Sequence, residues 1–340
     1  MEKIAVIGSG GWGTAIASLL ARNGHQVILW SYMQEESDAL KKDGENKRFL
    51  PGVALPAGIS FTASLEEALK DVRVIFMVTP SQAVLSTAKA MSPYVAAGSV
   101  IVNASKGLEQ TSLKRLSQVV KEAVPQATIA VMSGPSHAEE VARGLATTNV
   151  IACEDLAVSQ ELQDILMSDA FRVYTGTDIV GVELGGALKN VIALCAGIAD
   201  GIGLGDNAKA ALMTRGMAEI ARLGVAMGAE YETFSGLSGM GDLIVTCTSM
   251  HSRNRRAGIL IGQGMSPEEA IEEVKMVVEG FYTTKAAYML AQKLGVEMPI
   301  TEQAYGVLFE HKDPKTTVLN LMMREKKHET EREVIGSIPQ

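Results

Sequence analysis

The 340-residue sequence has few cysteines, few aromatic residues and no long uncharged apolar run. Its cysteines, Cys153, Cys195 and Cys247, form neither a C-x-x-C pair nor a zinc-ligand spacing, so we expect buried free thiols in a reducing compartment. No apolar stretch reaches the ~20 residues of a membrane span without glycine or polar interruption. Met1 to Lys3 leads directly into a strand-like run without a signal peptide, so we expect a cytoplasmic protein.

Positive charge is also scarce, since 31 Lys and Arg stand against 39 Asp and Glu, a net charge of −8 at pH 7. An acidic chain repels nucleic acid and anionic membranes unless a local basic patch overrides the global field. We therefore expect no nucleic-acid partner and no membrane span. The hydrophobic share of 47% is that of an ordinary globular protein, and the length predicts about two domains.

The two parts of the chain differ in their apolar pattern. Short β-branched runs alternate with amphipathic stretches up to about residue 180, which is typical of a mostly parallel sheet covered by helices. Apolar residues at helical spacing dominate afterwards. The pattern predicts an α/β domain over residues 1–180, an all-α domain over 181–325 and a mobile tail over 326–340. Helix starts are expected at Thr301-Glu302 and Asp313-Pro314. The expected strands are Ile4–Ile7, Val27–Trp30, Ile59–Thr62, Val72–Val78, Val100–Asn103, Ile129–Met132, Val150–Cys153 and Arg172–Tyr174.

A glycine-rich turn follows the first expected strand. Its sequence is Gly8-Ser9-Gly10-Gly11-Trp12-Gly13, which fits G-x-G-x-x-G, and a helix is expected from Thr14 to Asn23. Glycine permits a tight turn and a close approach of the backbone to a pyrophosphate, while the N–H groups of the following helix start bind the phosphates. The turn predicts a Rossmann-like domain that binds NAD(H) or NADP(H).

The end of the second expected strand leaves the choice of cofactor open. Domains that bind NAD usually carry an acidic residue about 20 residues after the glycine turn, and NADP-binding ones carry an arginine nearby. Here Trp30 is followed by Ser31, Tyr32 and Met33, and the first carboxylate is Glu35. The sequence therefore does not decide between NADH and NADPH.

One lysine stands alone in a long charge-poor segment. Lys189 is the only charged residue between Glu183 and Asp200, within a helix rich in glycine and alanine. Burial lowers the pKa of a lysine towards the range useful for proton transfer. A lysine that extends to solvent from an amphipathic helix is the alternative. We favour a catalytic Lys189.

Loops that follow two neighbouring strands carry further candidates. Lys106 comes after the expected strand Val100–Asn103, and the segment Ser133–Ala138 comes after the next one. Because the carboxyl ends of parallel strands line the ligand crevice, both are candidates for substrate contact. The alternatives are a solvated loop lysine and an ordinary turn.

A basic turn is the local exception to the acidic composition. Every charged residue from 243 to 267 is positive, namely Arg253, Arg255 and Arg256. Ser252 is the expected N-cap of a helix that runs to about residue 263. Arginine at a helix N-terminus opposes the helix dipole, which indicates a compensating anion such as a phosphate. A solvated basic turn is the main alternative, and a nucleic-acid patch is disfavoured by the acidic chain.

Together these segments closely resemble the NAD(P)-dependent glycerol-3-phosphate dehydrogenases of bacterial type. The resemblance covers nearly the whole chain, from GSGGWGTA at Gly8 to MPITE at Met298. Between them lie NASKGLE at Asn103, SGPSHAEE at Ser133, GGALKNVIA at Gly185, GLSGMGDL at Gly236, TCTSMHSRNRR at Thr246 and VVEG at Val277.

The resemblance implies roles for individual residues. It implies that Lys189 donates or accepts the proton and that Lys106 contacts both substrate and nicotinamide. The family often has a basic residue or histidine where this chain has Tyr32 and Met33, so an NADPH preference does not follow. The substrate contacts so expected are Lys106, Gly134, Ser136, Lys189, Asn190, Asp242, Thr246, Ser252, Arg253 and Asn254. With the glycine turn, the expected cofactor contacts are Gly8, Gly10, Gly11, Trp12, Gly13, Tyr32, Lys106, Ala138, Arg253, Val277 and Glu279.

The implied activity is reversible hydride transfer between NAD(P)H and dihydroxyacetone phosphate, which gives sn-glycerol 3-phosphate for phospholipid synthesis. The resemblance also implies a homodimer and no metal. Two alternatives stay open: another lysine-dependent hydroxyacid dehydrogenase of the β-hydroxyacid or 6-phosphogluconate type, and a non-catalytic NAD(H) sensor. The presence of both Lys106 and Lys189 argues against the sensor.

Overall fold

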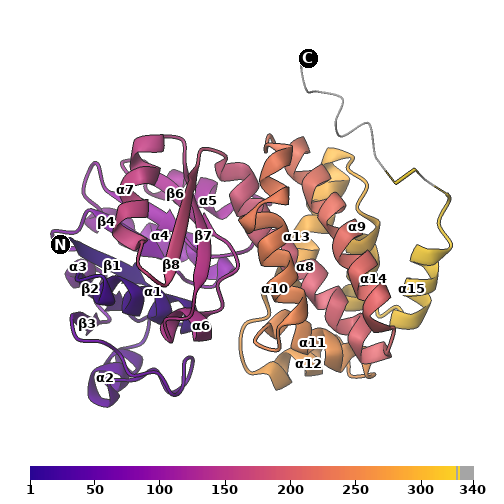
Figure 1. Ribbon diagram of the computed structural model, residues 1–340, viewed down its shortest axis with the longest axis horizontal. Helices are drawn as coiled ribbons and strands as arrows, with labels where there is room; N and C mark the ends of the chain where they lie inside the picture. The colour runs from indigo at the N-terminus through magenta and orange to yellow at the C-terminus, as the bar shows by residue number, and fades with distance from the viewer. Residues whose placement is uncertain (327, 330–340) are drawn as a thin grey trace.

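The computed structural model describes residues 1–326 and 328–329, and it has a sheet-containing half beside a helical half (Figure 1). This confirms the predicted α/β region followed by an all-α region. The strands are β1 (Lys3–Ile7), β2 (Gln26–Trp30), β3 (Ile59–Thr62), β4 (Val74–Met77), β5 (Val100–Asn103), β6 (Thr128–Ser133), β7 (Thr147–Cys153) and β8 (Phe171–Gly176). The helices of this half are α1 (Gly11–Arg22), α2 (Gln34–Asp43), α3 (Leu65–Leu69), α4 (Val84–Met91), α5 (Leu116–Ala123), α6 (Ala138–Ala142) and α7 (Leu156–Leu166).

The eight strands form one sheet in the order β3-β2-β1-β4-β5-β6-β7-β8. Every neighbouring pair is parallel except β6 and β7, which are antiparallel. The strand order reverses between β1 and β4, which is where open α/β sheets form a ligand crevice at the carboxyl ends of their strands. The loops after β1, β4, β5 and β6 therefore open towards the same crevice.

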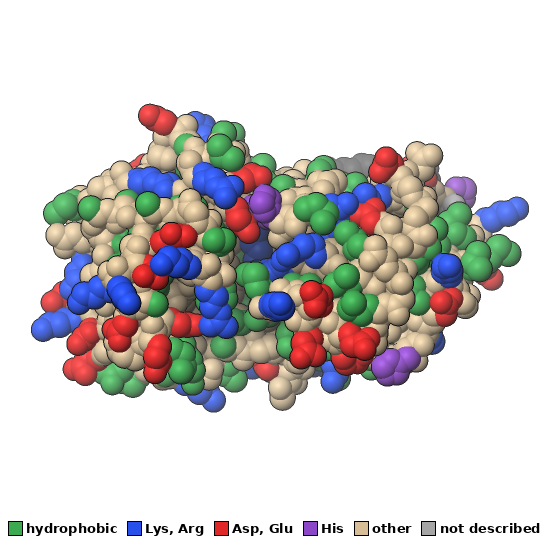
Figure 2. All heavy atoms as spheres, turned by 90° about the horizontal axis from the view of Figure 1, so that it is seen from below, with side chains coloured by type: hydrophobic (Ala, Val, Ile, Leu, Met, Phe, Trp, Pro, Cys, Tyr) green, Lys and Arg blue, Asp and Glu red, His purple; other side chains and the backbone are tan. Residues whose placement is uncertain are grey.

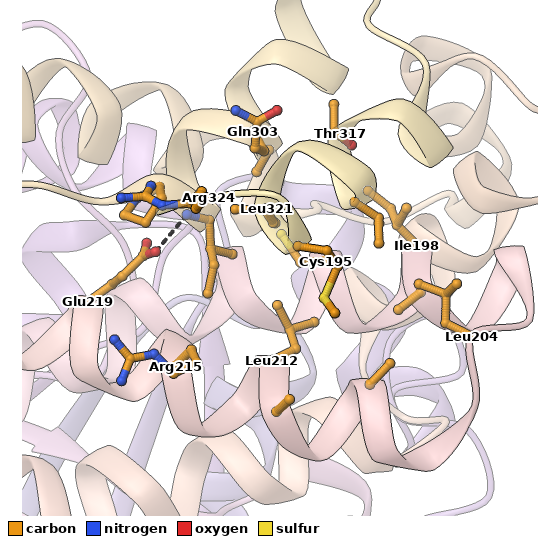
Figure 3. A pocket seen from close by; sticks show the side chains of 18 of the residues that line it. Cys195, Ile198, Leu204, Leu212, Arg215, Glu219, Gln303, Thr317, Leu321 and Arg324 are labelled. Atoms are coloured by element: carbon orange, nitrogen blue, oxygen red, sulfur yellow. Dashed lines mark hydrogen bonds between the residues drawn. The ribbon is translucent and has the colours of Figure 1, made fainter. Parts of the chain in front are cut away.

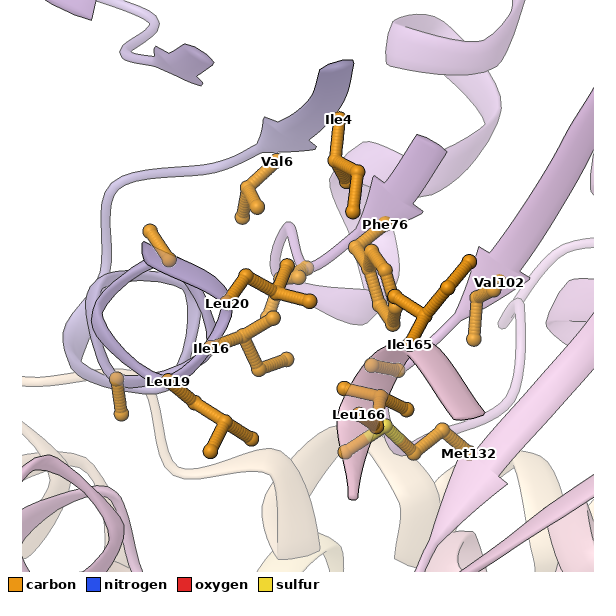
Figure 4. Close-up of a cluster of buried hydrophobic side chains, with 14 of the residues drawn as sticks. Ile4, Val6, Ile16, Leu19, Leu20, Phe76, Val102, Met132, Ile165 and Leu166 are labelled. Carbon is orange, nitrogen blue, oxygen red and sulfur yellow. The ribbon is translucent and has the colours of Figure 1, made fainter. Parts of the chain in front are cut away.

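Helices cover both faces of the sheet, which explains why its strands are apolar on both sides. On one face, Ile16 and Leu20 of α1 pack towards Ile4 of β1 and Phe76 of β4 (Figure 4). The opposite face is a separate cluster that contains Ile7 of β1. Two apolar faces per strand require the β-branched runs that identified these strands in the sequence.

Several element boundaries in this half differ from the sequence-based expectation; β7, for example, begins three residues earlier than expected, at Thr147. The helix expected from Thr14 already begins at Gly11, because the last part of the glycine turn is itself the first turn of α1. The strand expected at Val72–Val78 is shorter, since the Val72 N–H donates to the Leu69 carbonyl at 3.3 Å and so belongs to the turn after α3.

The helical half is built around one long central helix, α8 (Ile179–Ile202). By length and hydropathy α8 alone among the helices of the described residues could cross a membrane, but 83% of its most apolar window is buried inside the fold, as in a core helix. The other helices are α9 (Gly205–Ala226), α10 (Asp242–Thr248), α11 (Arg253–Gly262), α12 (Pro267–Val274), α13 (Glu279–Leu294), α14 (Pro299–Phe309) and α15 (Pro314–Met322).

Of the two expected helix starts in this half, one is confirmed and one is wrong. The Asp313 side chain accepts from the Thr316 N–H at 2.8 Å and caps α15. The helix expected from Thr301 instead begins two residues earlier, at Pro299. Its first amides are satisfied by a remote group, since the Glu219 carboxylate of α9 accepts from the Ile300 N–H at 2.6 Å and the Thr301 N–H at 3.1 Å. The cap itself comes from another helix, so the local signal for this start is Pro299 at the first helical position.

The three cysteines are free thiols, as predicted; Cys153 and Cys247 are buried and Cys195 is half-buried. Burial raises the pKa of all three thiols. The tail expected over residues 326–340 falls, apart from residues 326, 328 and 329, outside the described residues.

Candidate functional site

The surface is hollowed between the two halves, with lysine and arginine side chains in and beside the hollow and a histidine at its edge (Figure 2). The loops after β5 and β6 meet α8 and α10 here. Lys106 after β5 donates to Gly134 after β6 and, across the two halves, to Asp242 of α10, which also binds Lys189 of α8. This crevice collects the lysines that the sequence singled out.

Lys189 lies in the middle of α8 and is buried, with 6% of its surface exposed. Its ammonium donates to Asp242 Oδ1 and, at 2.7 Å, to Thr246 Oγ1. Asp242 begins α10 directly after a π-helical turn, Leu237–Gly241, and Thr246 lies one helical turn further on. The lysine is thus held by two polar side chains rather than extended to solvent.

Lys106 reaches the same carboxylate from the sheet-containing half. Its ammonium donates to Asp242 Oδ2 at 2.6 Å and to the Gly134 carbonyl at 3.1 Å. The Ser133 hydroxyl donates to the same Oδ2 at 3.4 Å, a contact that the sequence did not assign although Ser133 begins a quoted motif. One buried carboxylate therefore binds both lysines.

The charges of this cluster shift its pKa values. Burial lowers the pKa of Lys189 to about 8, helped by repulsion from Lys106 and opposed by the attraction of Asp242. Burial alone would raise the pKa of Asp242, but the two lysines hold it below its ordinary value. Burial, and then the charge of Lys189, lower the pKa of His137 at the start of α6. A lysine with a pKa near 8 can exchange protons near neutral pH.

The glycine turn has the shape that a pyrophosphate requires. Gly8 has φ +121°, and a Cβ there would lie 2.6 Å from the Val78 carbonyl oxygen. A Cβ at Gly13 would lie 1.8 Å from the Gly8 oxygen, whereas one at Gly10 would meet nothing within 4 Å. Gly10 caps α1 without a side chain, so the first N–H groups of the helix are open to a ligand. The buried Trp12 Nε1 has no hydrogen-bond partner in the described structure. These features fit a dinucleotide.

Two residues lie against the outer side of the glycine turn. A Cβ at Gly11 would be 2.9 Å from the Phe49 carbonyl oxygen and 3.7 Å from Ala138 Cβ. Ala138 was an expected cofactor contact. Phe49 was not, because the loop that carries it has no motif; its ring lies under the Arg48 guanidinium, 4.7 Å from the ring centroid.

Tyr32, another expected cofactor contact, follows β2 and is 80% exposed, with its ring edge-on to Trp30 at 6.2 Å. The first carboxylates after β2 lie in α2, where Glu36 accepts from Arg48 at 3.0 Å. The fold thus brings the Arg48 guanidinium beside the segment that follows β2. This proximity could not be seen in the sequence, where Arg48 comes 18 residues after Trp30. It does not place a carboxylate directly after the strand.

The basic turn is the N-terminus of α11, with Ser252 as its N-cap, as predicted. The three arginines are not equivalent, however. Arg255 is neutralised within the chain, since its Nε donates to Asp200 Oδ2 at 2.8 Å and a terminal nitrogen donates to the Thr248 carbonyl at 2.8 Å. Arg253 is half-buried, and burial lowers its pKa while Glu279 opposes that shift. Arg256 Nε is likewise buried without a hydrogen-bond partner among the described residues, so Arg253 and Arg256 are both left for an external anion, and Arg253 is the one expected to contact the substrate.

The expected substrate residues Asn190 and Asn254 contact each other. Asn254 Nδ2 donates to Asn190 Oδ1 at 2.9 Å, and Asn254 Oδ1 accepts from the Gly280 N–H at 2.8 Å. This joins α8, α11 and the start of α13. On the other side of the crevice, the Ser136 hydroxyl donates to the Gly134 carbonyl at 2.9 Å.

Glu279, the first residue of α13, crosses to the sheet-containing half. Its carboxylate accepts from the Ser81 N–H at 3.0 Å and the Ser81 hydroxyl at 2.5 Å. Burial raises the pKa of Glu279 despite these bonds and the nearby Arg253. Val277, expected beside the cofactor, precedes α13 and is 37% exposed. The sequence missed Ser81, which no motif marks.

A second cavity, of about 530 Å³, lies between α8, α9, α14 and α15 (Figure 3). Cys195, Leu212 and Gln303 are among its lining residues, and none of the expected site residues is. Within residues 1–326 and 328–329, no group of three or more His, Cys, Asp or Glu could hold a metal ion.

A Rossmann-like sheet with a helical half that buries a lysine against its ligand crevice defines a two-domain, dinucleotide-dependent dehydrogenase. Two family patterns match the chain: NAD-dependent glycerol-3-phosphate dehydrogenase N-terminus over residues 3–159 and C-terminus over residues 178–319. The chain belongs to the NAD-dependent glycerol-3-phosphate dehydrogenase family and is an NAD(P)-dependent oxidoreductase.

Relatives of this family match over nearly the full length. The glycerol-3-phosphate dehydrogenase [NAD(P)+] of Moorella thermoacetica is 56% identical over 97% of this chain and 98% of that protein. The protein of the same name from Bacillus cereus is 55% identical over the same shares. The solved glycerol-3-phosphate dehydrogenase of Coxiella burnetii has a TM-score of 0.92 at 41% identity, over 95% of this chain and 99% of that one. The resemblance found in the sequence is confirmed, and the hydroxyacid dehydrogenase and sensor alternatives are set aside.

Proposed function

We propose that this chain interconverts dihydroxyacetone phosphate and sn-glycerol 3-phosphate with NAD(P)H in the crevice between its halves, with Lys189 as proton donor and acceptor. The observation that carries this assignment is the buried Lys189 with a pKa of about 8, bound by Asp242 at the crevice that the glycine turn borders. Its relatives of the same family carry the activity in their names.

Lys189 protonates the oxygen that develops negative charge when the substrate carbonyl is reduced. Lys106, bound to the other oxygen of Asp242, supplies a second positive charge beside that oxygen. Asp242 and Thr246 hold Lys189 in place through hydrogen bonds, so the ammonium need not reorganise during the reaction. In the reverse direction neutral Lys189 accepts the proton of the substrate hydroxyl.

The substrate phosphate binds at the N-terminus of α11, where Arg253 and the free N–H groups of the helix face the same anion. Asn254 and Asn190 fix this helix to α8, which also carries Lys189. The phosphate contacts therefore set the position of the carbonyl relative to the lysine. Gly134, Ser136 and Ser252 complete the proposed substrate set.

The dinucleotide is held by Gly8, Gly10, Gly11, Trp12 and Gly13, with Ala138, Tyr32, Lys106, Arg253, Val277 and Glu279 as further contacts. When bound, its nicotinamide ring supplies or accepts the hydride. With no carboxylate directly after β2 and with Arg48 paired to Glu36, these residues favour neither NADH nor NADPH, and the relatives named for NAD(P)+ support use of either.

The biological setting is proposed from the same family membership. We expect a cytoplasmic homodimer that supplies sn-glycerol 3-phosphate for phospholipid synthesis and binds no nucleic acid. The domain bounds 1–180 and 181–325 are proposed likewise; the last strand ends at Gly176 and α8 begins at Ile179.

The test is steady-state oxidation of NADH and NADPH with dihydroxyacetone phosphate by the wild type and by Lys189→Met. The methionine keeps the aliphatic length of the side chain but removes the proton donor, so kcat should fall by ~10²–10⁴-fold. NADH binding, followed by its fluorescence, should be unchanged. Near-wild-type kcat in Lys189→Met would show that another group donates the proton. No NAD(P)H oxidation by the wild type with this substrate would overturn the proposed activity itself.

A further inference from the structure

A second buried charge on α8 faces the loop that carries Lys106. Glu183 is 3% exposed and lies six residues before Lys189, with Gly186 midway between them. Residues three apart are neighbours on a helix surface, so Gly186 lies next to both Glu183 and Lys189, which themselves point about 120° apart around α8. A Cβ at Gly186 would lie 3.6 Å from Lys106 Cδ and 2.3 Å from the Ser133 hydroxyl oxygen, so this side of α8 packs directly on the Lys106 side chain.

The Glu183 carboxylate is saturated with donors from the sheet-containing half. One oxygen accepts from the Ser117 N–H at 2.7 Å, in the first turn of α5. The other accepts from the Ser117 hydroxyl at 2.5 Å and from Arg115 at 2.8 Å. Glu183 thus caps α5 from another half of the molecule and neutralises a largely buried arginine.

Asn103 connects Glu183 to the Lys106 loop. It is the last residue of β5 and fully buried, and its Nδ2 donates to Glu183 Oε1 at 3.3 Å. The same side chain closes on its own loop, because Nδ2 donates to the Ser105 carbonyl and Oδ1 accepts from the Ser105 N–H, both at 3.3 Å. Ser105 is the residue before Lys106. Its hydroxyl is fixed in turn by the Thr79 carbonyl at 2.6 Å.

We infer that Glu183 is a positioning residue that, through Asn103, holds the Lys106 loop at a fixed place relative to Lys189. The two ammonium groups come from different halves of the molecule. Asp242 can bind both only if the two halves keep the same position relative to each other. Glu183 acts on this arrangement because it lies on the helix of one lysine and is hydrogen-bonded to Asn103, whose side chain is in turn bonded to Ser105, the residue before the other lysine. The inference rests on the proposed roles of Lys189 and Lys106.

Loss of Glu183 should change the titration of Lys189 as well as the rate. Repulsion from Lys106 is one of the causes that lower the pKa of Lys189. If the Lys106 loop moves away, this repulsion weakens and Asp242 pairs with Lys189 alone. The pKa of Lys189 then rises. A merely structural carboxylate would not shift it.

The experiment compares Glu183→Gln, Asn103→Ala and a matched control, Glu219→Gln. Glu219 is also a buried carboxylate that caps a helix from afar, but its partners Ile300 and Thr301 lie away from the lysines. We measure kcat for dihydroxyacetone phosphate reduction against pH, with folding checked by circular dichroism. Glu183→Gln and Asn103→Ala should lower kcat by roughly 10- to 100-fold. They should also move the basic limb of the profile upwards by about one pH unit, and Glu219→Gln should leave that limb in place.

An unchanged basic limb in both Glu183→Gln and Asn103→Ala would overturn the inference, whatever their stability. A limb that moves equally in Glu219→Gln would do so too, because the shift would then report general loosening. Should Glu183→Gln fail to fold, Asn103→Ala keeps the contacts of Glu183 to α5 and carries the test alone. Failure of the proposed function is separate, since it shows in the wild type before any variant is made.

Discussion

At the scale of single residues, the central feature of the candidate site is the Asp242 carboxylate, which forms ion pairs with two lysines. Asp242 is 1% exposed and contacts Lys189 and Lys106 through different oxygens. The sequence identified both lysines, since one stood in a charge-poor helix and the other after a strand. It could not show that they meet, because Asp242 lies 53 residues from Lys189 and 136 from Lys106. Only the three-dimensional packing of α8, α10 and the β5 loop brings them together.

The lowered pKa of Lys189 predicts opposite pH dependences for the two reaction directions. Reduction needs the protonated amine, so its kcat should fall as the pH rises through about 8. Oxidation needs the neutral amine, so its kcat should rise over the same range. Initial rates with saturating substrates from pH 6 to about 10 check this. Parallel profiles in the two directions would contradict the role of Lys189.

The partner of Lys189 can be tested by charge removal. Asp242→Asn keeps the shape of the side chain but removes the attraction that raises the pKa of Lys189, while burial and Lys106 continue to lower it. The basic limb of the reduction profile should therefore move to lower pH, by about one unit or more. This is the direction opposite to that expected for Glu183→Gln. Thermal unfolding serves as the check that the variant is folded, and an unmoved limb would contradict the coupling.

At the scale of elements, the contact between α8 and α11 places the phosphate site beside the lysine. Glycines occur four residues apart on both helices, Gly197 and Gly201 on α8 and Gly258 and Gly262 on α11. A Cβ at Gly197 would lie 2.1 Å from the Arg255 carbonyl oxygen, and one at Gly258 would lie 2.1 Å from the Leu194 oxygen. The two backbones therefore touch, as in glycine-mediated helix pairs. Their spacing became meaningful only once the fold placed α8 and α11 side by side.

We predict that Gly197→Ala separates the two helices. A methyl group at this backbone contact should cost about 1–3 kcal/mol of unfolding free energy. It should also raise the KM for dihydroxyacetone phosphate, because Arg253 moves with α11. The control is Gly176→Ala, where a Cβ meets nothing within 4 Å. Urea unfolding and steady-state kinetics measure both effects, and equal behaviour of the two variants would contradict the close contact.

The strands of the sheet were easier to predict from the sequence than the starts of two helices, α5 and α14. The strands of the sheet were predictable because burial on both faces demands β-branched runs. The start of α14 was predicted two residues too late: its carboxylate cap, Glu219, comes from a distant segment, and its local signal is Pro299 at the first helical position. The start of α5 combines a distant cap, Glu183, with a local one, since Gln118 Oε1 accepts from the Arg115 N–H at 3.1 Å. The distant part of such a cap leaves no trace in the residues around the helix start.

At the scale of the whole molecule, charged and polar side chains join the two halves at several places. Among them are the pairs Lys106 with Asp242, Arg115 with Glu183 and Ser81 with Glu279. The order of sheet and helices followed from the change of apolar period near residue 180, but these cross-contacts did not. Since the Lys106–Asp242 pair lies in the candidate site, the relative placement of the halves and the geometry of that site depend in part on the same bonds.

The stability of the whole chain should carry a pH dependence from Glu219. Burial raises the pKa of this carboxyl from 4.5 to about 7. The folded state therefore keeps a proton that the unfolded state releases, so the contribution of Glu219 is fully present below pH 4.5 and is lost as the pH rises through 7. Relative to Glu219→Gln, the wild type should lose up to ~3 kcal/mol between pH 4.5 and 8. Urea unfolding at both pH values measures this, and a constant difference would contradict it.

The arrangement of Lys106, Asp242 and Lys189 has a consequence for the energy of the reaction. Two ammonium groups around one carboxylate leave an unbalanced positive charge in a place largely shielded from water. An uncharged ketone does not neutralise this surplus, whereas an alkoxide does. The free enzyme is therefore destabilised by one uncompensated positive charge at this site. In the proposed reaction, the negative charge that develops on the carbonyl oxygen would compensate this local surplus, so the two lysines would stabilise the transition state more than the bound ketone.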